Sequence, residues 1–421
     1  MSSTSLPRVL RGSHGTPLRL DEHDAIFGPA DTTVNLIEAL EASGLTGRGG
    51  AGFPTSAKVR LLLRQRGHNK AVVVNAMEGE PASRKDASLL SANPHLVLDG
   101  AAALASMIGA HEIIVCIPAT SRALQYVRRA VEERLRDHRA GPHVEIVSPP
   151  ARYITGEESA LTHWLSERVA EPLYRAHRPF VPRLRNRPVL VDNVETCAHV
   201  GLIARHGAHW FRAVGTSESP GSTLVTLSGA LESPVVLEVA LGTPLRDLIA
   251  AARPTEEIQA VLLGGYGGSW LDGSLLDTPL ANESLRELGA SVGAGVVVAL
   301  GDGGCGILET SRVVTWMAGE SARQCGPCAF GLPALAHDLA TLVSGQRGAG
   351  AALERLAERC GVIEGRGACR HPDGVVRLVR SALGTFREHA LAHASGHVCP
   401  AVHLDRRYAR IPGAIAVAAR S

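Results

Sequence analysis

Hydrophobic and polar residues follow two different periods along the first half of the chain. Apolar positions three and four apart predict amphipathic helices, and short continuous apolar runs predict buried strands. The expected elements are a helix over 33–43, a strand over 71–75, a helix over 95–108, a strand over 112–117, a helix over 121–136 and a strand over 144–147. This alternation predicts an α/β sheet in which at least some strands are parallel.

The pattern changes twice in the second half. Strands over 223–228 and 235–239 joined by a turn, a helix over 245–252 and a strand over 260–264 predict a small α+β module of the β-grasp kind. Helical spacing then dominates and predicts a closing helical bundle. Its expected helices are 311–319, 331–344, 351–359 and 374–393.

Composition sets the class of protein. The chain has 421 residues, 45% hydrophobic and 20% charged, which is typical of a soluble multidomain protein and argues against disorder. The net charge of +2 is too even to predict a nucleic-acid or membrane-surface partner.

Targeting signals are absent from the pattern. The first 30 residues contain no apolar signal-peptide core. Asp99, His111 and Glu112 interrupt the most apolar stretch, 96–118, so no membrane span is expected. We therefore expect a cytoplasmic protein, in which the eight Cys are core thiols or metal ligands rather than disulfides.

Lysine is rare and concentrated. Of 43 basic residues, the only lysines are Lys58, Lys70 and Lys85. The first two blocks of candidate chemistry fall around this segment. Codon bias that depletes lysine is the alternative explanation.

A glycine-rich loop, GRGGAGFPT over 47–55, precedes a predicted helix. Its glycines let backbone N–H groups approach an anionic or planar ligand, as at a helix N-terminus. Arg48 and Lys58 would add positive charge. A simple tight turn has the same composition.

Paired carboxylates occur in two further blocks. Glu78 and Glu80 follow the strand over 71–75, at the edge where open α/β sheets bind ligands. They could accept hydrogen bonds from ribose hydroxyls or a nicotinamide amide, or belong to a solvated acidic loop. The block YITGEES over 153–159 repeats the design, with a strand-like entry, a glycine and two carboxylates before a helix. A fourth block, DNVET over 192–196, suits a phosphate or ribityl chain, and equally a helix N-cap.

In this order, the four blocks closely resemble the FMN- and NADH-binding subunit of respiratory complex I and its relatives in NAD-reducing hydrogenases and formate dehydrogenases. The resemblance runs from about Leu40 to Phe386. It implies a Rossmann-like FMN domain over 31–216 after an N-terminal arm over 1–30. A soluble-ligand-binding β-grasp domain over 217–305 and a helical bundle with an iron–sulfur region over 306–421 would follow.

The resemblance also implies roles for individual residues. The residues expected around FMN are Gly47, Arg48, Gly49, Gly50, Lys58, Asn75, Glu78, Gly156, Glu157, Asn193 and Thr196. Phe53 and Phe180 would flank the nicotinamide nucleotide, Glu80 and Glu158 would be its polar contacts, and Tyr153 would lie near the flavin. No protein nucleophile is needed, because the flavin carries the chemistry.

The chain departs from the family at the nucleotide site. Met77 stands where the family usually has Asp, Leu61 where it has an aromatic residue, and His177 or Arg178 where it has Lys. A missing stacking partner costs about 1 kcal/mol, so FMN binding is expected to be better preserved than NADH binding.

The cluster motif is incomplete. The family has CxxCxxC and a fourth Cys, whereas this chain has Ala322 at the first position and keeps Cys325, Cys328 and Cys369. Three thiolates suit [3Fe–4S], or [4Fe–4S] with a fourth ligand from water, His371 or another thiol. Cys305, Cys360 and Cys399 are the remaining nearby thiols, and each is better explained as a core or surface thiol. A zinc site at the CxxC is a further alternative.

The leading hypothesis is a flavoprotein oxidoreductase that passes electrons from NAD(P)H through FMN and an atypical cluster to a ferredoxin-like or thioredoxin-fold [2Fe–2S] protein. One alternative accepts electrons from a ferredoxin without NAD binding. Another is a non-catalytic scaffold protein with a vestigial flavin site.

Overall fold

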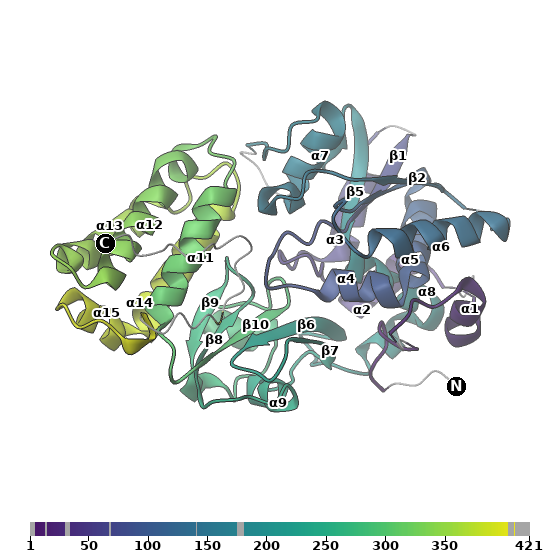
Figure 1. Cartoon of the computed structure of the whole chain (residues 1–421). Helices are drawn as coiled ribbons and strands as arrows, with labels where there is room; N and C mark the ends of the chain where they lie inside the picture. Colours follow the sequence, from purple (N-terminus) through teal and green to yellow (C-terminus); the bar gives the residue numbers. More distant parts are fainter. Residues whose placement is uncertain are drawn as a thin grey trace.

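The computed structural model describes residues 5–12, 15–29, 34–66, 69–139, 141–174, 181–402 and 408. Three bodies follow one another along the chain, and Figure 1 shows them side by side: the first sheet with its helices, a second sheet, and a helical bundle. No helix among the described residues is long and apolar enough to cross a membrane.

The first body contains a five-stranded sheet of order β3-β2-β1-β5-β4. Neighbouring strands are parallel except for the short edge strand β4, which pairs antiparallel with β5. Its elements are α1 (Leu20–Phe27), α2 (Leu36–Ser43), α3 (Thr55–Leu63), β1 (Lys70–Asn75), α4 (Lys85–Ala92), α5 (Pro94–Ile108), β2 (Ala110–Cys116), α6 (Leu124–Arg136), β3 (His143–Val147), the 3-10 helix η1 (Tyr153–Gly156), α7 (Glu158–Glu167), β4 (Arg183–Leu184), β5 (Arg187–Asn193) and α8 (Val194–Arg212).

Both faces of this sheet are buried. On β1, Val72 and Val74 pack into the core formed with α5 and α8, whereas Ala71 and Val73 pack on the opposite face, against Leu161 of α7. Alternate residues of a strand point to opposite faces, so a continuous apolar run is what a sheet covered on both sides requires.

The second body is a five-stranded sheet of order β7-β6-β10-β8-β9. The central pair β6 and β10 is parallel and the other pairs are antiparallel. Its elements are β6 (Ser222–Gly229), β7 (Val235–Ala240), α9 (Leu245–Ala251), β8 (Ile258–Leu263), β9 (Ser269–Asp272), η2 (Gly273–Leu275), α10 (Asn282–Glu287) and β10 (Val296–Gly301).

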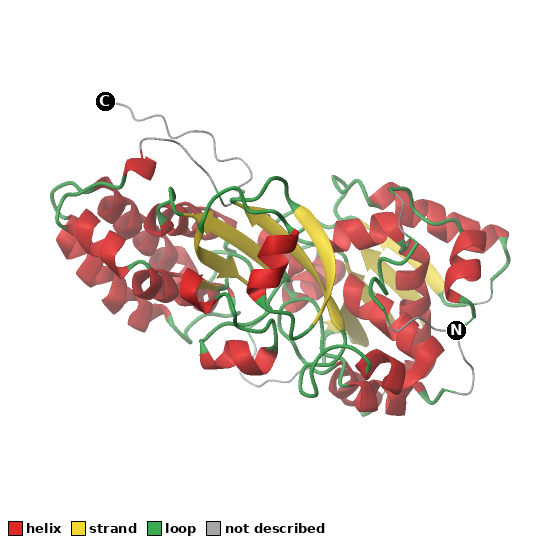
Figure 2. Cartoon of the chain, turned by 90° about the horizontal axis from the view of Figure 1, so that it is seen from below, coloured by secondary structure: helices red, strands yellow, loops and turns green. Residues whose placement is uncertain are grey.

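The third body is the bundle, and it covers the face of the second sheet opposite α9 (Figure 2). On β8, Leu262 belongs to the core shared with the bundle, and Val261 and Leu263 belong to the core shared with α9. The bundle consists of α11 (Gly306–Glu320), the π-helix η3 (Pro327–Gly331), α12 (Leu332–Ser344), α13 (Ala349–Ile363), α14 (His371–Thr385), α15 (Arg387–Ala394) and the short η4 (Pro400–Val402).

Three expectations about elements were wrong. The entry to the Tyr153 block is a 3-10 helix rather than a strand. The helix expected over 374–393 breaks at Phe386, which has φ −108° and ψ 38°. The second sheet also contains β9 and β10, which were not expected. Phe386 breaks the helix because its buried ring packs against Trp270, with ring centroids 5.1 Å apart, so tertiary packing overrides a continuous helical pattern.

In the first body, α5 and α8 approach each other very closely. A Cβ added at Gly100 would lie 1.7 Å from the carbonyl oxygen of Cys197, and one at Gly201 would lie 3.0 Å from that of Leu96. Glycines at both positions therefore let the two helices touch along their backbones.

We expect Gly100→Ala to lower the free energy of unfolding by about 2 kcal/mol, because α5 and α8 must move apart to accept the methyl group. Thermal unfolding of the purified chain measures this. Gly361→Ala is the matched control, since it is also helical and its added Cβ would meet nothing within 4 Å. That control should leave stability unchanged or slightly raised, and equal behaviour of the two variants would contradict the close-approach argument.

Candidate functional site

The glycine-rich loop lies over the carboxyl ends of β1 and β5. Asn75 ends β1 and Asn193 ends β5, and a Cβ added at Gly49 would lie 3.4 Å from Cβ of Asn193. The backbone N–H of Arg48 donates to Oγ1 of Thr196 at 2.9 Å, which fastens the loop to the first turn of α8. Gly49 and Gly50 themselves are exposed. The structure thus brings the first and fourth blocks together at the ligand-binding edge of an open sheet.

Asn193 also caps α8. Its side-chain oxygen accepts from the backbone N–H of Glu195 at 2.9 Å, as expected for an N-cap. The positive end of the α8 dipole therefore points to the same edge as the loop.

A buried ionic network lies directly beneath this edge. Nζ of Lys85 lies 2.7 Å from Oδ1 of Asp86 and 3.0 Å from Oε2 of Glu195, and it donates to Oδ1 of Asn193 at 3.1 Å. Burial alone would raise the pKa of Glu195, but the charges of Lys85, His199 and Arg48 lower it to about 2. Glu195 is therefore a carboxylate at every physiological pH.

The two predicted cations are used inside the protein. Arg48 is buried and donates to Oγ1 of Thr46 at 3.0 Å and to the carbonyl of Ser222 at 3.1 Å. Nζ of Lys58 donates to Oε1 of Glu158 at 2.9 Å and to the carbonyl of Val191 at 2.6 Å. These side chains stabilise the loop and the strand ends, which leaves backbone N–H groups as the loop's own donors to a ligand.

Asp192 lies 3.7 Å from Lys58 through its Oδ1. Burial raises the pKa of Asp192 to about 6 although Lys58 opposes the shift. Oδ2 of the same carboxyl is buried and has no hydrogen-bond partner among the described residues. The edge of the sheet therefore carries a carboxyl that titrates near neutral pH.

Glu78 accepts hydrogen bonds from the backbone N–H groups of Asp86 and Ala87 at 2.9 Å each and from Ser83 at 2.8 Å. Burial and the charge of Asp86 raise its pKa. Its carboxyl thus caps the N-terminus of α4.

Glu80 connects the first body to the second. Its Oε2 accepts from the backbone N–H of Tyr266 at 2.9 Å, in the turn between β8 and β9. Gly265 makes this contact possible, because a Cβ there would lie 2.6 Å from the same oxygen. Burial raises the pKa of Glu80 to about 7 although the N–H groups of Tyr266 and Ala82 oppose the shift.

The Tyr153 block joins the ligand-binding edge of the first sheet to the bundle. Asn75 donates through Nδ2 to the carbonyl of Gly156 at 2.8 Å, and the backbone N–H of Tyr153 donates to Oε2 of Glu320 at 2.9 Å. The Tyr153 ring stands edge-on to Trp316 and His371, with centroids 5.5 Å away in both cases. Glu157 caps α7 by accepting from the N–H groups of Ser159 and Ala160 at 2.9 Å.

Two of the three predicted cluster ligands, Cys325 and Cys328, lie between α11 and α12, and the third, Cys369, lies just before α14. Cys328 and Cys369 are buried and Cys325 is partly exposed. Burial raises the pKa of the Cys328 thiol, and the charges of Cys325 and Cys369 raise it further; the three sulfur atoms do not all lie within 4.8 Å of one another.

His371 follows Cys369 by two residues, at the first position of α14. It is 7% exposed, its Nε2 lies 2.9 Å from the carbonyl of Met317, and its Nδ1 has no hydrogen-bond partner among the described residues.

Some of the residues expected at the nucleotide belong to the described part of the chain and others do not. Phe53 belongs to the glycine-rich loop and is 37% exposed, so a flat ligand can reach its ring. Phe180, together with His177 and Arg178, lies outside the described residues. Met77 packs in the core under α7 with Val73 and Leu161, so its replacement of the family's Asp exchanges a polar group for a core side chain.

Two regions of the chain match known protein families. Residues 40–202 match the Nuo51 FMN-binding domain, and residues 309–393 match the NADH-ubiquinone oxidoreductase-F iron-sulfur binding region. The NADH-quinone oxidoreductase F 2 subunit of Rhizobium meliloti is 32% identical over 383 residues, 88% of this chain and 91% of the relative. The chain belongs to the family of NADH-quinone oxidoreductase F subunits.

Other members of this F-subunit family extend the relationship. The NADH-quinone oxidoreductase F subunit of Streptomyces coelicolor is 33% identical, with 87% of this chain and 84% of the relative covered. The HndC subunit of the NADP-reducing hydrogenase of Solidesulfovibrio fructosivorans is 28% identical over 88% of this chain and 78% of its own length.

Among solved structures, an NAD⁺-reducing [NiFe]-hydrogenase in the H₂-reduced state matches with a TM-score of 0.81 at 28% identity. The match covers 94% of this chain and 68% of that one.

The predicted family, enzyme class and cofactors are thereby confirmed. This member of the F-subunit family is an NADH dehydrogenase-like flavoprotein oxidoreductase, and NAD(H), FMN and an iron–sulfur cluster are the groups that its two matched regions serve in electron transfer.

Sequence reasoning missed the partners of the charged residues. Asp86 and Glu195 surround Lys85, yet they stand 109 positions apart, and although Glu195 belongs to the fourth block, no motif indicated that the three side chains meet. The only signal was the scarcity of lysine, which singled out Lys58 and Lys85. It also missed a group formed by Cys305, His393 and Cys399.

We expect Glu80 to make the stability of the apoprotein fall as pH rises. Its pKa is raised from 4.5 to about 7 on folding, so between these values the folded state holds a proton that the unfolded chain has lost. The unpaired charge at higher pH costs up to about 3 kcal/mol. Glu80→Gln keeps the acceptor for Tyr266 and removes the titration, so its advantage over the wild type should grow between about pH 5 and about pH 8.

Urea unfolding across this pH range measures the difference. Glu358→Gln, at an exposed position of α13, controls for the loss of one carboxylate. Parallel stability curves for wild type and Glu80→Gln would contradict the assignment.

Proposed function

We propose that this chain oxidises NAD(P)H at an FMN bound over the carboxyl ends of β1 and β5. Electrons then leave through a cluster held by Cys325, Cys328 and Cys369 to a ferredoxin-like or thioredoxin-fold [2Fe–2S] protein. The observation that carries the proposal is the Tyr153 block, which hydrogen-bonds Asn75 at the flavin edge on one side and Glu320 of the cluster-bearing bundle on the other.

The topology supports the domain names that we propose. Parallel strands β3, β2, β1 and β5 with helices on both faces support a Rossmann-like domain. In the second sheet, the central parallel pair, antiparallel outer pairs and the packing of α9 on one face support a β-grasp domain. We propose boundaries near residues 216 and 305, in the connections that precede β6 and α11.

The residues present fit FMN. Gly49 and Gly50 are exposed and carry no side chain that would fill the space above Asn193, and the N-terminus of α8 opens on the same edge. Both features favour an anionic and planar ligand. When bound, FMN supplies the exchange between a two-electron hydride donor and one-electron acceptors.

The protein's own residues position the nucleotide and exclude water from the site. The exposed ring of Phe53 offers a stacking surface for a nicotinamide or adenine ring. Glu158 is fixed by Lys58 at 2.9 Å and is placed to accept hydrogen bonds from a ribose. Tyr153, which packs between Trp316 and His371, closes the space between the flavin edge and the bundle with aromatic rings.

The donor set also fits an iron–sulfur cluster with one unusual ligand. Three thiols supply three of the four positions that [4Fe–4S] requires. His371 suits the fourth position, because Nε2 engages the carbonyl of Met317 and leaves Nδ1 unpaired among the described residues. Ligating histidines commonly donate their other ring nitrogen to a backbone carbonyl in this way.

The proposed activity is tested by adding NADH, and separately NADPH, to FMN-loaded protein under anaerobic conditions. We expect the flavin absorption at about 450 nm to decrease when one of the two nucleotides is added. Flavin that stays oxidised with both nucleotides and is reduced by a reduced ferredoxin would contradict NAD(P)H oxidation and support the ferredoxin-accepting alternative. Protein that cannot bind FMN would support the scaffold alternative.

The cluster ligands are tested by substitution in anaerobically purified protein. Cys328→Ser should lower iron and sulfide by about tenfold while FMN remains, because a thiolate is lost from a set of three. His371→Ala should retain iron but change the EPR spectrum of the reduced cluster, and His371→Cys should give an all-thiolate spectrum. Cys360→Ser, a buried thiol of α13, is the control. An unchanged spectrum in His371→Ala would exclude His371 as a ligand.

A further inference from the structure

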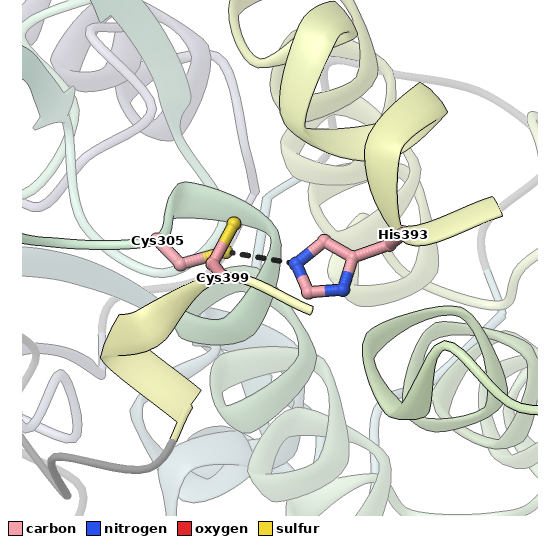
Figure 3. Close-up of side chains that lie close together, drawn as sticks. All are labelled: Cys305, His393 and Cys399. Atoms are coloured by element: carbon pink, nitrogen blue, oxygen red, sulfur yellow. Dashed lines mark hydrogen bonds between the residues drawn. The ribbon is translucent and has the colours of Figure 1, made fainter. Parts of the chain in front are cut away.

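A second group of soft metal ligands lies at the start of α11. Figure 3 shows Cys305, His393 and Cys399 with their side chains pointing toward one another. Sγ of Cys305 lies 3.4 Å from Nε2 of His393, and the three ligand atoms all lie within 4.8 Å of one another. Cys305 and His393 are buried, at 2% and 0% exposure, and Cys399 is partly exposed.

We propose that Cys305, His393 and Cys399 bind one divalent metal ion of the zinc class. A tetrahedral ion with Zn–S of about 2.3 Å and Zn–N of about 2.0 Å separates its sulfur and nitrogen ligands by about 3.5 Å. The 3.4 Å between Cys305 and His393 is close to this value. Two thiols with one imidazole are a donor set that zinc prefers, and the fourth position is open to an exogenous ligand such as water.

Packing holds the three ligands in place before any ion binds. Cys305 is the N-cap residue of α11, and the next residue, Gly306, would place an added Cβ 2.1 Å from the ring of Phe386. This contact brings the start of α15, and with it His393, onto the start of α11.

Cys399 is fixed from both sides. A Cβ added at Gly345 would lie 2.7 Å from Val398, which seats the preceding residue against the end of α12. Ala401 is buried in the bundle core two residues later. The ligands therefore come from three separate segments that the fold already brings together, and binding costs little ordering.

This group is distinct from the proposed cluster site. The helix α11 separates Cys305 from the turn that carries Cys325 and Cys328, and its 15 residues span about 22 Å. Neither Cys305 nor Cys399 can therefore serve as the fourth ligand of the cluster, and the expectation that both are ordinary core or surface thiols is replaced by this proposal. Cys360 remains a buried thiol in the core of the bundle.

Binding exchanges protons for the ion. Each thiol loses its proton when it ligates, and neutral His393 donates the lone pair of Nε2, so the ion binds without any oxidant or reductant. The ion would tie the segment after α15 to the junction between the second sheet and the bundle.

The test measures zinc, iron and FMN separately in the full chain, purified anaerobically from cells supplied with zinc. We expect about one zinc per chain in the wild type and in Cys360→Ser. Cys399→Ser and His393→Ala should lose most of that zinc and keep iron and FMN at wild-type levels. Cys399 is partly exposed, so its substitution keeps the proposal testable if a buried variant fails to fold.

Cobalt gives an independent readout. After removal of zinc with a chelator, Co²⁺ added to the wild type should give the long-wavelength bands of a tetrahedral thiolate site, and Cys399→Ser should not. Zinc content that is equal in wild type and variants would overturn the proposal, as would a Cys305–Cys399 disulfide in zinc-free protein seen by peptide mass mapping. Either failure leaves the NAD(P)H experiment unaffected, because flavin reduction is measured without reference to zinc.

Discussion

A buried lysine ammonium between two carboxylates holds the ligand-binding edge of this protein together. Lys85 pairs with Asp86 and Glu195, and Oε1 of Glu195 accepts from Thr223 at 3.0 Å and from the backbone N–H of Leu224 at 2.9 Å. The network thereby joins α4, α8 and β6, which belong to two different bodies of the fold. Removing one partner from a buried ion pair costs about 3–5 kcal/mol, because the other charge is left uncompensated.

This charge balance is internal, and it includes Arg48 of the loop above, whose Nε lies 3.8 Å from Oε1 of Glu195. Arg48 and Lys58 pair with acceptors of the protein itself, so neither side chain has to move in from elsewhere when a ligand binds. A phosphate then meets backbone N–H groups and a helix N-terminus, which are fixed in direction. The two lysines that the composition singled out, Lys58 and Lys85, thus both pair with carboxylates at this edge.

The sequence predicted those parts of the structure that local patterns control. The apolar run over 71–75 and the helical spacing over 95–108 depend on neighbouring residues, and β1 and α5 begin and end within one or two residues of the predicted bounds. Short β9 was not predicted because four residues carry little periodicity. The break at Phe386 was not predicted because Trp270, which receives its ring, is 116 positions away. The site shows the same division: motifs predicted the four ligand blocks, whereas the contact of Lys85 with Glu195 joins two segments that are far apart in the sequence.

The helix α11 links two changes that look unrelated in the sequence. Ala322, just beyond its C-terminal end, replaces the first Cys of the family motif, and Cys305 stands at its N-terminal end. If Cys305 compensated for the Cys that Ala322 replaces, the thiol of Cys305 would have to reach the same iron as a Cys at position 322. A rigid helix of 15 residues keeps them about 22 Å apart, so the gain and the loss are independent. Any ligand that replaces the missing thiolate therefore has to come from near Cys325, as we propose for His371, whose Nδ1 has no hydrogen-bond partner among the described residues, and the cysteines near α15 need a different explanation.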